Sequence, residues 1–90
     1  GTKAEAEHRA VLALRERVLG EEHPNTLESR NDLANALNSL GKGAEAEAEH
    51  RAVLAVRERR LGAEHPDTLV SRSNLAAALG AQGKPEKAAA

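Results

Sequence analysis

Histidines and carboxylates are the residues of this 90-residue sequence that could support metal binding or acid–base chemistry. The four histidines are His8, His23, His50 and His65. Zinc requires three or four ligands at about 2 Å, whereas equivalent points on neighbouring helices lie roughly 8–10 Å apart. Because the sequence has neither a His-x-x-x-His pair nor a cysteine, we expect no metal site. His23 and His65 precede prolines and are expected to help start a helix, whereas His50 is expected to fill a spacer position.

Catalysis has equally little support. The carboxylates occur in Glu-Ala-Glu runs that we expect to be solvated, whereas a general acid or base needs a desolvated cleft to tune its pKa. The serines lack a strained turn and a nearby orienting base, and there is no glycine-rich phosphate loop. We therefore expect no catalytic residues, no cofactor and no enzymatic activity.

Charge and composition narrow the class of partner. Lys and Arg number 13 and Asp and Glu number 14, whereas nucleic-acid-binding proteins usually carry a basic face. The sequence has no Phe, Tyr or Trp on which bases could stack. No apolar run approaches the roughly 20 residues of a membrane span, and no signal peptide is evident. We expect a cytoplasmic protein that binds neither nucleic acid nor membrane.

An internal repeat organises the chain. The stretch Ala4–Ala13 recurs as Ala46–Ala55, and later pairs such as Gly41 and Gly83 keep the same offset of 42 residues. Roughly two-thirds of the aligned positions are identical, which excludes chance similarity. A period of this length is typical of stacked helical units that share one continuous core.

Each unit contains two helical patterns. Strong helix formers fill the first, glycines follow a basic last turn at Gly20 and Gly62, and prolines open the second at Pro24 and Pro66. The connections are short, so neighbouring helices are expected to run antiparallel. We predict one all-α unit over residues 1–90, with helices at about 3–19, 24–40, 44–61 and 66–82 and a stub from about residue 85.

The spacing of Leu33, Ala34, Leu37, Gly41 and Ala46 resembles the tetratricopeptide repeat pattern. The match is closest to the 42-residue variety, similar to kinesin light-chain repeats and bacterial arrays of that type. The motifs that carry this resemblance are Leu61-Gly62, Glu64-His65-Pro66-Asp67-Thr68-Leu69, Asn74-Leu75-Ala76 and Gly83-Lys84. Leu37 and Leu79 stand where the family usually has an aromatic residue, so aromatic peptide contacts are not expected.

The resemblance implies a right-handed α-solenoid of antiparallel helical hairpins, with the helices in B-A-B-A order. It also implies a groove along the A helices that binds an extended peptide. The residues placed on this concave face are Glu28, Asn31, Asp32, Asn35 and Asn38, followed by Val70, Ser73, Asn74, Ala77 and Gly80. The alternative is that these residues are only the solvent faces of their helices. Asparagine is unusual in mid-helix, however, and its amide can both donate to and accept from a peptide backbone.

A second hypothesis is a structural repeat, natural or engineered, that associates head to tail. Stacked repeats bury their apolar faces only against neighbours. The residues expected on the two open ends are Val11, Leu14, Val18, Leu69, Leu75 and Leu79. We expect the stub to be poorly ordered if this contact forms, and a monomer remains the alternative in dilute solution. The partner of the first hypothesis is an unidentified protein or peptide.

Overall fold

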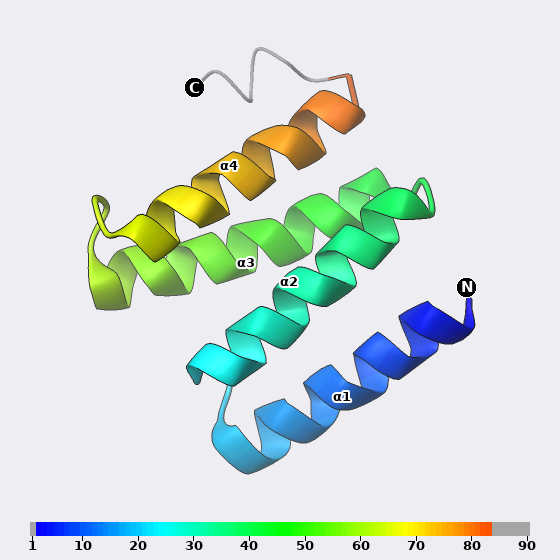
Figure 1. Cartoon of the computed structure of the whole chain (residues 1–90), viewed down its shortest axis with the longest axis horizontal. Coiled ribbons are helices and arrows are strands. Elements are labelled where there is room, and N and C mark those ends of the chain that lie inside the picture. The colour runs from blue at the N-terminus through cyan, green and yellow to red at the C-terminus, as the bar shows by residue number, and fades with distance from the viewer. Residues whose placement is uncertain (1, 84–90) are drawn as a thin grey trace.

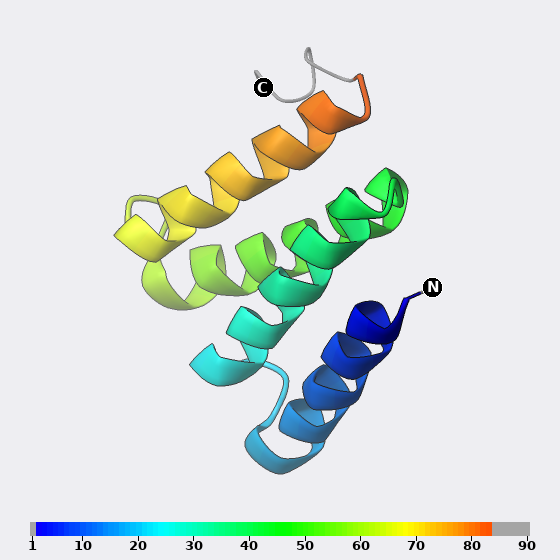
Figure 2. The same cartoon turned by 45° about the vertical axis from the view of Figure 1, so that its right-hand side comes forward.

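The computed structural model describes residues 2–83, and in this range the chain forms four α-helices and no strand (Figure 1). The helices are α1 (Lys3–Leu19), α2 (Pro24–Ser39), α3 (Gly43–Leu61) and α4 (Pro66–Ala81). They follow one another from one end of the molecule to the other, each packed on the next (Figure 2). The predicted all-α fold of helical hairpins is confirmed. The helix bounds differ from expectation by at most one residue, and the expected stub lies outside the described residues.

Local sequence explains where the helices begin. The Nδ1 atoms of His23 and His65 accept hydrogen bonds at 3.0 Å from the backbone N–H groups two residues further on, and a proline follows each histidine. The Thr2 hydroxyl likewise accepts from the Glu5 N–H at 3.1 Å. These bonds satisfy N–H groups that have no partner inside a helix. The predicted role of the two histidines in starting a helix is confirmed.

Glycine explains where α1 and α3, the two B helices, end, whereas α2 and α4 are the A helices. Gly20 and Gly62 have φ values of 94° and 93°, in the region that other residues rarely adopt. The N–H of each glycine donates to a carbonyl four residues earlier, at 3.1 Å in both repeats. The chain can therefore leave the helix and turn back within four residues.

The core lies where α2 passes between α1 and α3. Leu33 and Leu37 of α2 are almost completely buried and form a cluster with Leu12 of α1 and Ala46 of α3. Replacing such a leucine by alanine typically costs about 2–5 kcal/mol. With no aromatic side chain available, aliphatic packing of this kind holds the hairpins together.

A polar anchor repeats in both hairpins. Arg15 Nη1 donates to the Asn25 carbonyl at 2.9 Å and to the Ser29 hydroxyl at 2.8 Å. Arg57 makes the same two bonds, at 3.2 and 2.9 Å, to the residues 42 positions further on. Each B helix is therefore tied to the first turns of the A helix that follows.

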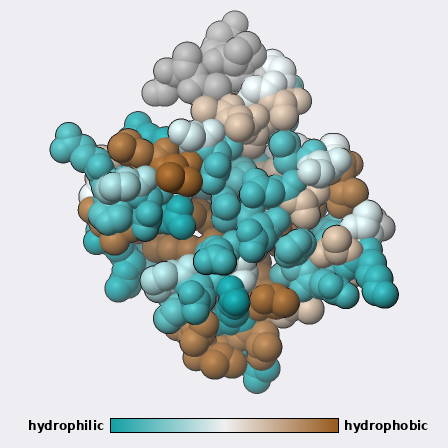
Figure 3. All heavy atoms as spheres, viewed as in Figure 1, coloured by the Kyte–Doolittle hydropathy of each residue, from teal (hydrophilic) through white to brown (hydrophobic). Residues whose placement is uncertain are grey.

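Apolar residues remain at the surface near the end of α1 and the start of α4 (Figure 3). The exposed members of the set expected on the open ends are Val11, Leu14, Val18 and Leu69. Leu75 and Leu79, in contrast, are buried within the chain, so their assignment to an open face is wrong. The reason is that α4 packs on α3 and turns these two leucines into that contact.

Candidate peptide-binding face

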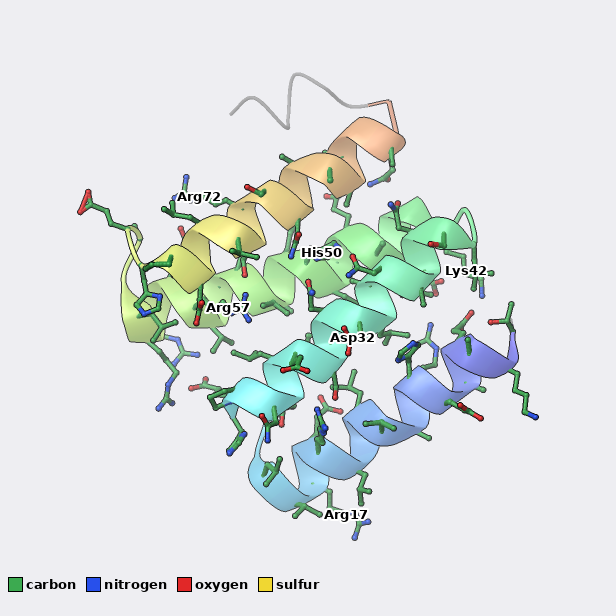
Figure 4. The ribbon with its side chains drawn as sticks, in the orientation of Figure 1. Arg17, Asp32, Lys42, His50, Arg57 and Arg72 are labelled. Atoms are coloured by element: carbon green, nitrogen blue, oxygen red, sulfur yellow. The ribbon has the colours of Figure 1, made fainter. Side chains whose placement is uncertain are left out.

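Residues of the two A helices meet across a hydrogen bond. Asn74 Nδ2 of α4 donates to Asn31 Oδ1 of α2 at 3.0 Å, although the two residues are 43 positions apart in the sequence. This bond links the middle turns of α2 and α4, although α4 packs on α3 rather than on α2. Figure 4 shows Asp32, the residue that follows Asn31, in the middle of α2. The A-helix face is defined here as Glu28, Asn31, Asp32, Asn35, Asn38, Ser73, Asn74 and Ala77.

Every member of the A-helix face reaches solvent. Asn31, Asn38 and Asn74 are half-buried, and the other five are exposed. The two asparagines at the junction use their amides on each other. In the part of the chain that the structure describes, no other side chain of this face forms a hydrogen bond. Most of its polar groups are therefore available to a ligand.

The charge of the A-helix face is negative. Glu28 and Asp32 are its charged members, and neither forms an ion pair within residues 2–83. Several other carboxylates of the chain are paired, as Glu16 and Glu49 are with Arg30. An unpaired carboxylate on a solvated helix attracts Lys or Arg from a partner.

A pocket of about 330 Å³ opens near one end of the A-helix face. Its lining includes Asn38, Gly43, Ala81 and Gln82. A side chain on Gly43 would place its Cβ 2.5 Å from Gln82 Cγ, so only glycine fits beside this glutamine as it lies here. Gln82 Nε2 donates to Glu47 Oε1 at 3.0 Å. Sequence reasoning did not place Gly43 or Gln82 at a site, although a glycine in the first turn of a helix was a usable signal.

A larger pocket, of about 560 Å³, lies at the opposite ends of the A helices. Leu27 and Val56 contribute apolar surface, and His23, His65 and Arg60 contribute polar surface. It lies between the two hairpin loops, since residues from both loops line it. No local sequence pattern indicated this pocket, because it depends on how one hairpin stacks on the next.

Two carboxylates join segments that are far apart in the sequence. Glu5 accepts from Lys42 Nζ at 2.8 Å and from Arg9 Nε at 2.9 Å. These hydrogen bonds lower the pKa of Glu5 to about 2, with Lys42 contributing most. Glu22 is bound by Arg59 and Arg60, and the same effect lowers its pKa to about 2.

We expected His50 to fill a spacer position, but the structure places it in the interior. It is buried in α3, and burial lowers its pKa below the ordinary value because the charged form would lose hydration. His8, at the equivalent position of α1, is only half-buried. Across residues 2–83, no three His, Asp or Glu side chains converge in positions that could hold a metal ion.

The fold and this face define a class of protein, namely helical-repeat modules of paired antiparallel helices. Models of the tetratricopeptide repeat family match residues 30–90 and residues 1–25. The chain belongs to the tetratricopeptide repeat family, whose repeats generally mediate protein–protein interactions or scaffolding. A search of curated proteins found no match. Within the described residues, no helix combines the length and the apolar character that crossing a membrane requires.

Proposed function

We propose that this chain is a non-enzymatic interaction module that binds an extended segment of another protein along the A-helix face. The observation that carries the proposal is the Asn31–Asn74 hydrogen bond, which joins α2 and α4 into one surface. The polar side chains around this bond are accessible and have no partner within the described residues.

The chemistry of the face specifies the kind of segment. Asn35 and Asn38 can each offer a donor and an acceptor to the backbone of an extended peptide. Glu28 and Asp32 lie one helical turn apart on α2 and favour Lys or Arg in the ligand. A basic segment with free backbone amides therefore fits this face better than an acidic one.

Two labelled 12-residue peptides test the proposal. They share the same apolar positions and carry either lysine or glutamate at the alternate positions. Fluorescence anisotropy should show binding of the lysine peptide that is tighter by about tenfold at low salt, because Glu28 and Asp32 attract it. Asp32→Asn should weaken binding of the lysine peptide, and Asn35→Ala should weaken binding of both peptides.

Matched controls separate the face from the rest of the surface. Glu21→Gln removes an exposed carboxylate outside the face, and Asn25→Ala removes an exposed asparagine from the start of α2. Both controls should bind as the parent does. The proposal fails if neither peptide binds, or if the variants of the face bind as tightly as these controls.

A further inference from the structure

Equivalent residues of the two repeats differ in how deeply they are buried. Leu27 of α2 is 6% exposed, whereas Leu69, its counterpart in α4, is 49% exposed. Val53 of α3 is 1% exposed, whereas Val11, its counterpart in α1, is 44% exposed. The side chains are identical, so the difference must come from what covers them.

The covering element can be identified by comparing neighbours. The α1–α2 contact is the counterpart of the α3–α4 contact, so both repeats contain it. The α2–α3 contact, in contrast, has no counterpart on α4 or on α1 among the described residues. The additional burial of Leu27 therefore comes from α3, and that of Val53 comes from α2. Leu69 and Val11 lie on faces that lack this one contact.

The charges that serve the α2–α3 contact are also repeated. Arg30 of α2 binds Glu16 of α1 at 2.7 Å and Glu49 of α3 at 3.0 Å. Arg72, its counterpart in α4, binds Glu58 at 3.0 Å. The counterpart of Glu49 is Glu7, which is exposed on α1 and has no ion-pair partner within residues 2–83.

A second set of charges is likewise paired between the two hairpins but unpaired at the equivalent positions of the outer faces. Glu22 in the first loop binds Arg59 and Arg60 of α3. The counterparts of Glu22 and Arg59 are Glu64 and Arg17, both exposed and unpaired in the described part of the chain. In Figure 4, Arg17 and Arg72 lie at opposite ends of the molecule, on the outer sides of α1 and α4.

We propose that the outer face of α4 binds the outer face of α1 of a second copy of this chain, in the register in which α2 packs against α3. Leu69 then faces Leu14 of the second copy, in the same way as Leu27 and Val56 both line the pocket between the hairpins. Arg72 pairs with Glu7 of the second copy, and Glu64 pairs with its Arg17. The contact joins two different surfaces, so it leaves one face free at each end and continues into longer assemblies. One pair of helices makes a small interface, and association therefore requires high protein concentration.

Sedimentation equilibrium with interference detection measures this association, since the chain has no aromatic absorbance. The mean mass should rise with concentration and pass beyond that of a dimer. Leu69→Glu and Val11→Glu should each abolish the rise. Val70→Glu is the matched control, because its counterpart Glu28 stays exposed even though α2 is covered by α3. Far-UV circular dichroism establishes that each variant keeps the helicity of the parent.

An exchange of charges tests the register. Arg72→Glu and Glu7→Arg should each weaken association, because they place like charges opposite each other. An equimolar mixture of the two variants should associate at least as well as the parent. When the two variants alternate along the assembly, every junction joins unlike charges at positions 72 and 7. Arg72→Glu also disturbs the pair with Glu58, but that change is present in the mixture too, so only the contact between copies explains recovery.

Three results would overturn the proposal. A monomeric mass at every concentration means that the two faces do not bind each other. A mass that stops at the dimer means that a symmetric contact forms instead. A mixture of charge variants that associates no better than either variant alone means that the register is wrong.

Discussion

Two buried threonines at equivalent positions have different hydrogen bonds. The Thr26 hydroxyl donates to the Arg15 carbonyl at 3.3 Å, whereas the Thr68 hydroxyl, equally buried, has no hydrogen-bond partner among residues 2–83. A buried polar group without a partner costs about 1–3 kcal/mol relative to its hydrated state. The repeat therefore provides a matched pair of sites in which the side chain and its position are the same but the hydrogen bonding differs.

Thr68→Val should either leave the free energy of unfolding unchanged or raise it, because it removes an unpaired hydroxyl. The full removal of that penalty would raise it by about 1–3 kcal/mol. Thr26→Val should instead lower the free energy of unfolding by about 0.5–1.5 kcal/mol. Thermal melts followed at 222 nm measure both changes, at about 4–8 °C per kcal/mol for a chain of this size. Equal losses in the two variants would mean that Thr68 has a partner after all.

Residue-level exposure was the least predictable property of this sequence. His8 and His50 have the same neighbours from Ala4 to Ala13 and from Ala46 to Ala55, yet only His50 is buried. No local pattern can separate them, because the difference is that α2 covers α3 on a side where α1 has no neighbour within the described residues. The spacer position expected for His50 was wrong for this reason.

At the scale of elements, ion pairs connect segments that do not follow one another in the sequence. Glu5 ties the start of α1 to the loop before α3, and Glu22 ties the first loop to the end of α3. In both cases arginine or lysine holds the pKa of the carboxyl near 2, below its ordinary value of 4.5. Protonation of Glu5 and Glu22 should weaken these ion pairs, because a neutral carboxyl no longer attracts Lys42, Arg59 or Arg60.

The stability of the fold should therefore decrease as pH falls from about 4.5 towards 2. In this window the unfolded chain takes up protons that folded Glu5 and Glu22 do not, so acid favours the unfolded state. Urea unfolding between pH 7 and pH 2 measures this dependence. The double variant Glu5→Gln, Glu22→Gln should be less stable at pH 7 and should lose less on acidification.

His50 contributes in a separate pH window. Burial lowers its pKa below the ordinary 6.5, so unfolding becomes easier as pH falls below that value.

A pH profile of the double glutamine variant that still matches the parent between 4.5 and 2 would contradict the role given to Glu5 and Glu22.

Helix boundaries could be predicted almost to the residue, because glycine, proline and capping side chains act within one turn. The direction that each apolar stripe faces could not. Leu69, Leu75 and Leu79 all belong to the apolar positions of α4, yet only Leu69 is exposed. Which of them is covered depends on the packing of α4 against α3, and that packing is set by the tertiary arrangement.

At the scale of the whole molecule, the candidate site was predictable only as a set of residues. The repeat aligns Asn31 with Ser73, but the hydrogen bond that joins the A helices goes to Asn74 instead. The bond thus joins positions that are not equivalent in the two copies. An alignment of the two copies contains no information about how one hairpin stacks on the next.

The proposed contact between copies also predicts that a substitution at position 18 tightens association. Position 18 is valine where the second repeat has Arg60, which binds Glu22 at 2.8 Å. Val18→Arg should therefore add a pair with Glu64 of the next copy and tighten association by about 1.5- to 5-fold at low salt, the range for exposed ion pairs. Sedimentation equilibrium at low and high salt measures the change, which salt should remove.

Val18→Gln is the control for that gain, because it replaces the same valine without adding charge. The two variants should differ at low salt and agree at high salt. Equal association of Val18→Arg and Val18→Gln at low salt would place position 18 away from Glu64.

Because the helices pack in a linear order, the outer and the middle helices should differ in how easily they unfold locally. Among the described residues, α2 and α3 each have a helix on both sides, whereas α1 and α4 each have one. Opening α1 or α4 removes the packing against one neighbouring helix and, for α4, the Asn31–Asn74 hydrogen bond, while opening α2 removes the packing against two helices and exposes Leu33 and Leu37. Amide protons of α1 and α4 therefore exchange with solvent through partial openings, and those in the middle of α2 and α3 exchange only when the whole chain unfolds.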